Sequence, residues 1–215
     1  LEGANLEGAN LEGANLSGSR LSKAFLPGAN LRGANLADLV ANSVRLHSAD
    51  LHSANLKGAR LGEANLEGAN LEGADLSGAN LGGANLEGAD LSGAMLAKAN
   101  LEGAGTAGVV LYGGNLEGAN LSGVNLEGTN LYGVNLEGAN LTGVNLSGTD
   151  LTGVNLSGTD LTGAVADGRT VWPDDFDPDV AGVYEIGPGA NLQGADLRGV
   201  ILTGADLTEA NLTEA

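Results

Sequence analysis

Cysteine is absent from this 215-residue sequence, which excludes disulfide bonds and thiolate metal sites. Aromatic residues make up only 3% of the chain, and there is a single Met. No apolar run approaches the roughly 18 residues that a membrane-spanning helix needs, so no membrane span is expected. Residue 1 is Leu and no signal peptide is recognisable, so we expect a processed or excised piece, and the loss of a targeting segment stays an open alternative. The compartment stays open, with the cytoplasm slightly favoured.

Basic residues are also scarce. Nine Lys and Arg stand against 27 Asp and Glu, which gives a formal net charge of −18. The charge is uneven, because residues 16–65 hold six basic against three acidic residues and residues 66–215 hold three against 21. The acidic excess predicts a soluble surface. Alternatively, it lets the surface compete with nucleic acid for a basic partner, whereas binding of nucleic acid by the chain itself is not expected.

The sequence contains a leucine at every fifth position from Leu1 to Leu161, interrupted only at Ala41 and Thr106. A helix advances about 100° per residue, so a step of five residues produces no apolar stripe. A flat strand would turn successive leucines to opposite faces. A chain that bends in every pentapeptide can point them all at a shared axis, so the pattern predicts a solenoid.

Each position in the pentapeptide has a predicted role. In a block such as Ala4-Asn5-Leu6-Glu7-Gly8, Leu points inward and the small Ala shares its face, while Asn faces outward and stacks along the solenoid. Gly occupies the third turn position, which in a type II turn needs φ > 0. We expect another turn type where a different residue stands there, at Lys23, Asp38, Ser43, Ser48, Ser53, Glu63 and Lys98.

Departures from the motif indicate the length of a coil. The large and small inward residues exchange places at Leu39 and Ala41, which roughly keeps the enclosed volume. The small position enlarges to Val or Thr in two sets that match at a lag of twenty, consistent with four pentapeptides per coil, although a lag of ten fits almost as well. The two sets are Val124, Thr129, Val134 and Val144, Thr149, Val154.

Runs such as Ala64-Asn65-Leu66 and Ala74-Asp75-Leu76 resemble the pentapeptide repeat family, whose motif reads Ala-(Asp/Asn)-Leu-X-X. The resemblance covers everything outside residues 166–190 and is closest to the Leu-rich cyanobacterial branch. It implies an all-β fold, a right-handed, four-sided (quadrilateral) β-helix of about 20 residues per coil. Much of that branch has no assigned activity, so the resemblance does not supply a function.

The five-residue spacing of leucine divides the chain into three predicted parts. Residues 1–165 are expected to form a β-helix of about eight coils, residues 166–190 a non-repeat excursion, and residues 191–215 a short stack of about one coil. We expect Trp172, Phe176, Val180 and Tyr184 of the excursion to pack on the side or end of the coils. The alternating Asp175, Asp177 and Asp179 resemble a calcium loop, but Val180 and Ile186 replace its Gly and Glu, which favours an acidic turn.

Candidate interaction residues are bulky or basic groups at outward positions. Tyr112 and Tyr132 lie twenty residues apart and are predicted to stack on the surface, where they serve either a partner or the solenoid itself. Phe25 and Met95 replace outward polar residues, and Trp172 and Phe176 belong to the excursion. Arg20, Lys57 and Arg60 map to one side, and Lys23 and Arg45 to the next, which gives a basic corner. It binds an acidic partner or the acidic end of another copy, or it is scattered surface charge.

No catalytic constellation, metal site or cofactor motif is present in the sequence, so an enzyme is not expected. We expect a structural scaffold that contacts an unknown protein partner through its flat faces or ends, or associates end to end with copies of itself. The second hypothesis is an acidic mimic of DNA that acts on DNA gyrase or another topoisomerase. The third is a repeat module of a larger regulatory protein.

Overall fold

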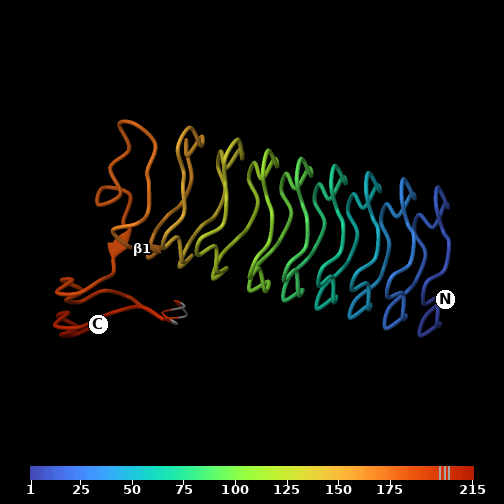
Figure 1. Cartoon of the computed structure of the whole chain (residues 1–215), viewed down its shortest axis with the longest axis horizontal. Helices are drawn as coiled ribbons and strands as arrows, with labels where there is room; N and C mark the ends of the chain where they lie inside the picture. Colours follow the sequence, from blue (N-terminus) through green and yellow to red (C-terminus); the bar gives the residue numbers. More distant parts are fainter. Residues whose placement is uncertain (199, 201, 203) are drawn as a thin grey trace.

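The chain winds into a row of stacked coils in a computed structural model that describes residues 1–198, 200, 202 and 204–215 (Figure 1). Residues twenty positions apart pair as parallel β-bridges, from Asn5 with Phe25 to Asn145 with Val165. The regular bridges recur at every fifth residue, so a coil of twenty residues contains four pentapeptides. This confirms the lag of twenty and excludes the lag of ten.

Regular strands are short in this arrangement. The described residues form two strands, β1 (Val165–Ala166) and β2 (Tyr184–Glu185), which pair in parallel with Val165 opposite Tyr184. Elsewhere each pentapeptide is a turn followed by one bridging residue, because five residues leave room for a single extended position. The chain is therefore a β-helix solenoid held by isolated bridges and not by sheets of ordinary length. In the described part of the chain, no helix has the length and apolar character to cross a bilayer.

The leucines fill the interior as the five-residue frame predicts. From Leu51 to Leu101 each repeat Leu is at most 1% exposed, and the exchanged residues Leu39 and Ala41 are also buried. A buried Leu contributes about 1.5–3 kcal/mol. Four of them cannot offset the roughly 20–40 kcal/mol needed to order twenty residues of backbone. Stability therefore depends on contacts between neighbouring coils, as in other repeat proteins.

The prediction of a different turn type at the non-glycine positions was wrong. Lys23, Ser53 and Glu63 adopt φ values of 60°, 54° and 57°, the same left-handed region that Gly adopts elsewhere in this position. The turn itself sets this geometry, because Glu214 at the end of the chain has φ 64° although its amide donates to no other coil. In the main stack the amide of this residue also donates to the next coil. Ser53, for example, donates to the carbonyl oxygen of Glu72 at 2.9 Å. The pentapeptide turn therefore keeps one geometry, which the inter-coil bonds support, even where the side chain disfavours it by about 1–2 kcal/mol.

The outward asparagines stabilise both their own turn and the stack. The Oδ1 atom of Asn30 accepts the N–H of Arg32 at 3.1 Å, and its Nδ2 atom donates to Oδ1 of Asn10 at 3.2 Å. Asn55 donates in the same way to Asn35 in the preceding coil. These ladders of side-chain amides confirm the predicted outward stacking.

The backbone ladder between coils is interrupted in the region of residues 104–155. In regular coils the amide of each bridging residue donates to a carbonyl of the preceding coil, as from Asn120 to Ala99 at 2.9 Å. Among the bridging residues from Phe25 to Val165, this bond is missing at four positions. They are Asn125, Asn130, Asp150 and Asn155.

Stacked β-branched residues account for three of these breaks. Val109, Thr129 and Thr149 lie above one another in the small inward position, and the ladder bond is missing at both boundaries between them. The stacked pair Val134 and Val154 has the same effect. A single branched residue beside Ala is tolerated in the regular coils, since Asn65 still donates to Val44 at 2.8 Å. Two branched side chains at the ~4.8 Å spacing of strands crowd each other, which breaks the bond at these three boundaries. The stacked pair Val124 and Val144 keeps its bond, at 3.2 Å, so crowding does not break the ladder at every such pair.

Threonine hydroxyls replace part of the lost hydrogen bonding. Thr149 Oγ1 donates to the carbonyl oxygen of Leu126 at 3.0 Å, and Thr159 Oγ1 donates to that of Leu136 at 2.9 Å. The Asn125 carbonyl, next to the remaining break, accepts the hydroxyl of Thr106, the residue that interrupts the Leu frame. The Leu126 and Leu136 carbonyls also accept the N–H of Thr129 and Ala139 in their own turns, so the two hydroxyls add bonds between coils. The Thr106 hydroxyl serves a carbonyl that has no backbone donor.

The excursion lies at the end of the stack, and the last repeats lie beside it (Figure 1). Trp172 and Phe176 are partly buried against the main core, whereas Tyr184 packs against a second cluster formed by Val165, Ile186, Leu192 and Ala195. Val180 is 85% exposed, so the prediction that it packs on the coils was wrong. It follows the Asp177 turn, whose Oδ1 atom accepts the N–H groups of Asp179 and Val180 and directs the chain outward.

Candidate functional site

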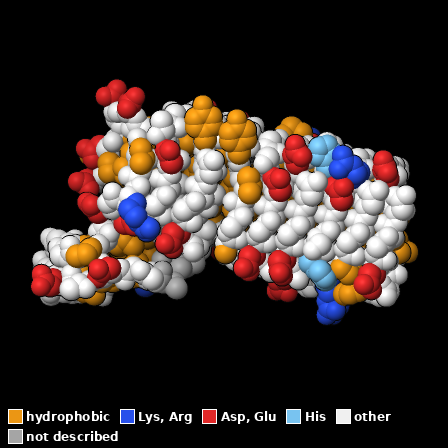
Figure 2. Space-filling view, in the orientation of Figure 1, with side chains coloured by type: hydrophobic (Ala, Val, Ile, Leu, Met, Phe, Trp, Pro, Cys, Tyr) orange, Lys and Arg blue, Asp and Glu red, His pale blue; other side chains and the backbone are white. Residues whose placement is uncertain are grey.

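Tyr112 and Tyr132 form a stacked pair on the outside of the solenoid. Their ring centroids are 5.9 Å apart and the ring planes differ by 9°. The side chains are 51% and 59% exposed, and Val110 beside them is 41% exposed. Figure 2 shows a largely polar face on which hydrophobic side chains gather at only a few places. The pair is thus a rigid aromatic surface built from consecutive coils.

The other outward apolar residues differ in how much of their surface is covered. Phe25 is half-buried, with the Arg45 guanidinium carbon 5.7 Å from its ring centroid and the His47 ring 6.2 Å away at an edge-on angle. Met95 is 44% exposed. Phe25 therefore belongs to a local cluster with Arg45 and His47, whereas Met95 offers an accessible apolar contact.

The predicted basic residues are exposed but do not form a tight cluster. Arg20 and Arg60 occupy the same column of bridges, with Val40 paired between them. Lys57 is exposed on the same side. Among the described residues, none of these three cations forms an ion pair.

Trp172 and Phe176 stack on each other, with centroids 5.2 Å apart and an interplanar angle of 23°. Both also pack against the main core. The two rings therefore fasten the excursion to the last coils, and less of their surface is available to a partner than in the tyrosine pair.

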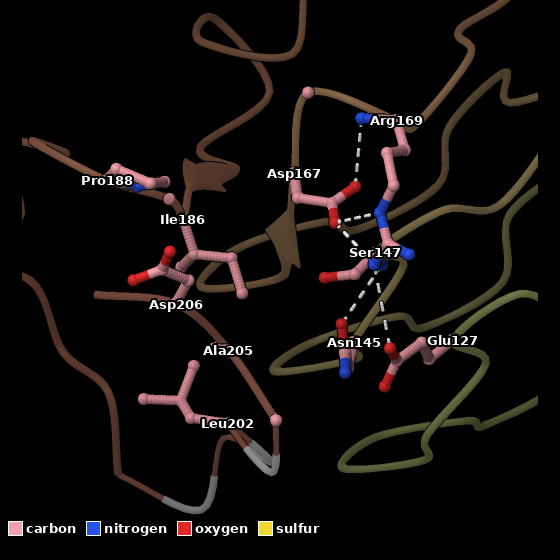
Figure 3. Close-up of a pocket in the computed structure, with 13 residues that line it drawn as sticks. Glu127, Asn145, Ser147, Asp167, Arg169, Ile186, Pro188, Leu202, Ala205 and Asp206 are labelled. Atoms are coloured by element: carbon pink, nitrogen blue, oxygen red, sulfur yellow. Dashed lines mark hydrogen bonds and ion pairs between the residues drawn. The ribbon is translucent and has the colours of Figure 1, made fainter. Parts of the chain in front are cut away.

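A cleft of about 350 Å³ lies between the last regular coils, the start of the excursion and the final repeats (Figure 3). Its polar lining includes Glu127, Ser147, Asp167, Arg169 and Asp206, and its apolar lining includes Ile186, Pro188, Leu202 and Ala205. Arg169 is tied to one side of the cleft, because its Nη2 lies 2.7 Å from Asp167 Oδ2 and 3.7 Å from Glu127 Oε1.

Two carboxylates of this cleft have lowered pKa values. Burial of Asp167 raises its pKa, but the bonds that its carboxylate accepts from the Arg169 guanidinium and the Gly148 N–H outweigh burial, so the pKa lies below its usual range. The hydroxyl and N–H of Thr208 lower the pKa of Asp206. Both groups are therefore negatively charged at neutral pH.

Ser147 is the unusual member of the cleft. The residue is only 4% exposed, and no described residue forms a hydrogen bond with its Oγ atom. Its backbone N–H is satisfied by Asn145 Oδ1 at 3.0 Å. In Figure 3 the hydroxyl points into the cleft, between Asp167 and Asp206.

Comparison with known proteins identifies the repeat. The profile described as "Pentapeptide repeats" matches eight copies over residues 1–39, 45–83, 74–104, 107–138, 129–165 and 189–215. The chain belongs to the pentapeptide repeat family. The comparison with curated proteins gives no match.

Solved structures of other pentapeptide repeat proteins resemble the chain. One is HetL, a pentapeptide repeat protein involved in heterocyst differentiation regulation from the cyanobacterium Nostoc sp. strain PCC 7120, with 32% identity and a TM-score of 0.50. The match covers 100% of this chain and 87% of HetL. A pentapeptide repeat protein from the Arabidopsis thaliana thylakoid lumen is 34% identical over 43% of this chain and 65% of its own, with a TM-score of 0.42.

Sequence reasoning on the pentapeptide repeat located the tyrosine pair but missed the cleft. The available signal was the coil period itself, since Glu127, Ser147 and Asp167 are spaced by twenty and lie in one column. The contribution of Ile186, Leu202 and Asp206 could not be foreseen, because it depends on how the final repeats pack after the excursion.

Proposed function

We propose that this pentapeptide repeat protein is a non-enzymatic scaffold that contacts a protein partner through the face carrying Tyr112 and Tyr132. We also infer that its coils are right-handed and four-sided, with the three-part division at residues 165/166 and 190/191. The family assignment and the four bridges per twenty residues support this geometry.

The exposed tyrosine pair is the observation that carries the proposal. Tyrosine is enriched at interfaces because it combines a large apolar ring with a polar hydroxyl and loses little entropy when it becomes fixed. Stacking at 5.9 Å already restricts both rings in the free protein. A partner would therefore meet a preorganised surface, which reduces the ordering cost of association.

The outward polar groups support a binding role for this protein over a catalytic role. The Oδ1 atoms of Asn30, Asn55 and Asn100 accept the N–H of a residue two positions later, so they are committed to their own turns. HetL, which this chain covers over most of its length, is described as involved in regulation. That description is compatible with a protein that acts by binding.

A photo-crosslinking experiment tests this proposal. A benzophenone amino acid at position 110, beside the pair, is expected to capture one discrete protein from a native lysate, and Tyr112→Ala/Tyr132→Ala should reduce that capture at least tenfold. Thr152→Ala is the matched control, because Thr152 is an exposed residue of the same column in the next coil. Equal capture by the double variant, with an unchanged circular dichroism spectrum, would contradict the proposal.

Acidity favours a second candidate, a mimic of DNA that acts on DNA gyrase or another topoisomerase. The net charge of −18, concentrated in residues 66–215, is the supporting observation. A supercoiling assay with purified gyrase tests it. Inhibition or protection by micromolar protein is expected, with loss of the effect as salt screens the charges. Unchanged supercoiling at that concentration would rule this candidate out.

A further inference from the structure

We propose that the cleft around Ser147 binds a primary alkylammonium group, the chemistry shared by a lysine side chain and a small aliphatic diamine. The site is separate from the tyrosine face and does not depend on the function proposed above.

Charge in the cleft favours a cation. Three carboxylates, Glu127, Asp167 and Asp206, line it against the single cation Arg169. Arg169 is already bound to Asp167 and lies near Glu127, so it does not neutralise Asp206. Asp206 is satisfied only in part, by the N–H and hydroxyl of Thr208. An added positive charge would therefore meet uncompensated negative charge.

The unpartnered hydroxyl of Ser147 points to a specific ligand atom. A buried polar group without a hydrogen bond costs about 1–3 kcal/mol. Ser147 is 4% exposed and its Oγ has no partner among the described residues, although it faces the cleft (Figure 3). Because the oxygen is itself inaccessible in the free protein, a donor in the cleft would satisfy it after a small shift of the lining. The buried position of the hydroxyl distinguishes the site from an ordinary acidic surface.

The chemistry of the lining favours an ammonium on an aliphatic chain. An ammonium carries three donors that radiate from one atom, which suits acceptors on separate segments such as Ser147, Glu127 and Asp206. A planar guanidinium prefers two acceptors on one group. Ile186 and Leu202 supply apolar surface for the methylene groups, as in other buried lysine stems.

Two other ligand classes fit less well. Among the described residues, no group of three or more His, Cys, Asp or Glu is arranged to hold a metal ion. The volume of about 350 Å³ is at the small end of the ~300–1,000 Å³ typical of ligand pockets, which favours a side chain or a small amine over a nucleotide.

Calorimetric titration of the full chain tests the proposal with cadaverine and with Nα-acetyl-lysine N-methylamide as probes. Millimolar or tighter binding of at least one probe is expected, together with at least tenfold weaker binding of the Nε-acetylated lysine probe, which has no charge. Tighter binding of the lysine probe indicates a lysine of a partner protein, and tighter binding of cadaverine indicates a free diamine. Failure of both probes to bind would overturn the proposal.

Variants separate a binding role of Ser147 from a structural one. Ser147→Ala is expected to weaken probe binding about tenfold while raising the melting temperature of the free protein, because it removes an unsatisfied hydroxyl. Ser157→Ala is the matched control, since Ser157 holds the same turn position on an exposed surface. Arg169→Gln should strengthen binding at least threefold by freeing Asp167 and Glu127. Equal affinities in wild type, Ser147→Ala and Arg169→Gln would contradict the site.

Discussion

The hydroxyl of Thr149 donates to the carbonyl oxygen of Leu126 at 3.0 Å, at the coil boundary where the amide of Asp150 no longer reaches the carbonyl of Thr129. One side chain therefore both crowds the ladder and supplies another hydrogen bond across the same boundary. Two substitutions can separate these effects, because Val keeps the branched shape without the hydroxyl and Ala removes both.

We expect Thr149→Ala to restore the bond from the Asp150 amide to Thr129, as seen at Asn65, where Val44 lies beside Ala. Its hydrogen exchange should slow about fivefold or more, equivalent to roughly 1 kcal/mol. Thr149→Val should leave that exchange unchanged and lower the free energy of unfolding by about 1–3 kcal/mol, since the hydroxyl bond is lost. Residue-resolved hydrogen exchange and urea unfolding measure both effects. Slower exchange in the Val variant would contradict the crowding explanation.

The same explanation predicts that a break can be introduced into a regular coil. Ala64→Val would place a second branched residue beside Val44, so we expect loss of the 2.8 Å bond from the Asn65 amide to Val44 and destabilisation by about 1–3 kcal/mol. Ala54→Val is the matched control, because Ala34 and Ala74 lie on either side of it. Faster exchange at Asn65, with a smaller effect of the control variant on unfolding, is the expected result. Equal effects of the two variants would argue against stacking as the cause.

The turn position allows a reciprocal exchange of Gly with other residues. Glu63 has φ 57° and Gly78 has φ 66°, and no atom lies within 4 Å of a Cβ added to Gly78. We expect Glu63→Gly to stabilise the protein by about 1 kcal/mol and Gly78→Ala to destabilise it by a similar amount. The reason is that a residue with a Cβ atom disfavours the left-handed conformation, whereas Gly does not. Thermal unfolding provides the measurement. Shifts of the same sign in the two variants would refute this account.

Acid should weaken the end of the stack through Asp167. Its pKa is lowered in the folded protein, so its stabilising effect is complete above the ordinary aspartate pKa of 3.8 and is lost as the pH falls from there through the folded-state pKa. We expect Asp167→Asn to be less stable than wild type at pH 7 and to approach it below pH ~3. Melting temperatures across this range test the prediction. A constant difference at all pH values would exclude a contribution from this carboxylate.

The regular part of the fold could be predicted because its information is local. The period of five identifies Leu as inward and Asn as outward, and the matching Val and Thr sets are consistent with a coil of twenty. The stacked Tyr112 and Tyr132 follow directly from that number. The prediction failed at Ser53 and Glu63, because the pentapeptide turn keeps its left-handed geometry in spite of the residue's own preference.

The cleft lay beyond prediction for a different reason. Glu127, Ser147 and Asp167 share a column that the period reveals, but their pocket is closed by Ile186, Leu202 and Asp206 after a non-repeat segment. No periodic rule relates those residues to the column. The exposure of Val180 has the same origin, because the Asp177 turn determines its direction.

The pairing of Asp150 with Val171 spans 21 positions, whereas the preceding bridge from Asn145 to Val165 spans twenty. The additional residue is accommodated between Ala166 and Thr170, where the Asp167 carboxylate accepts the Gly148 N–H in place of a backbone carbonyl. A gene encoding such a chain can gain or lose whole coils of twenty residues without changing the register of the neighbouring coils. The stack is compatible with a single-codon insertion only at a turn of this kind, where a side chain accepts the hydrogen bond that a backbone carbonyl accepts elsewhere.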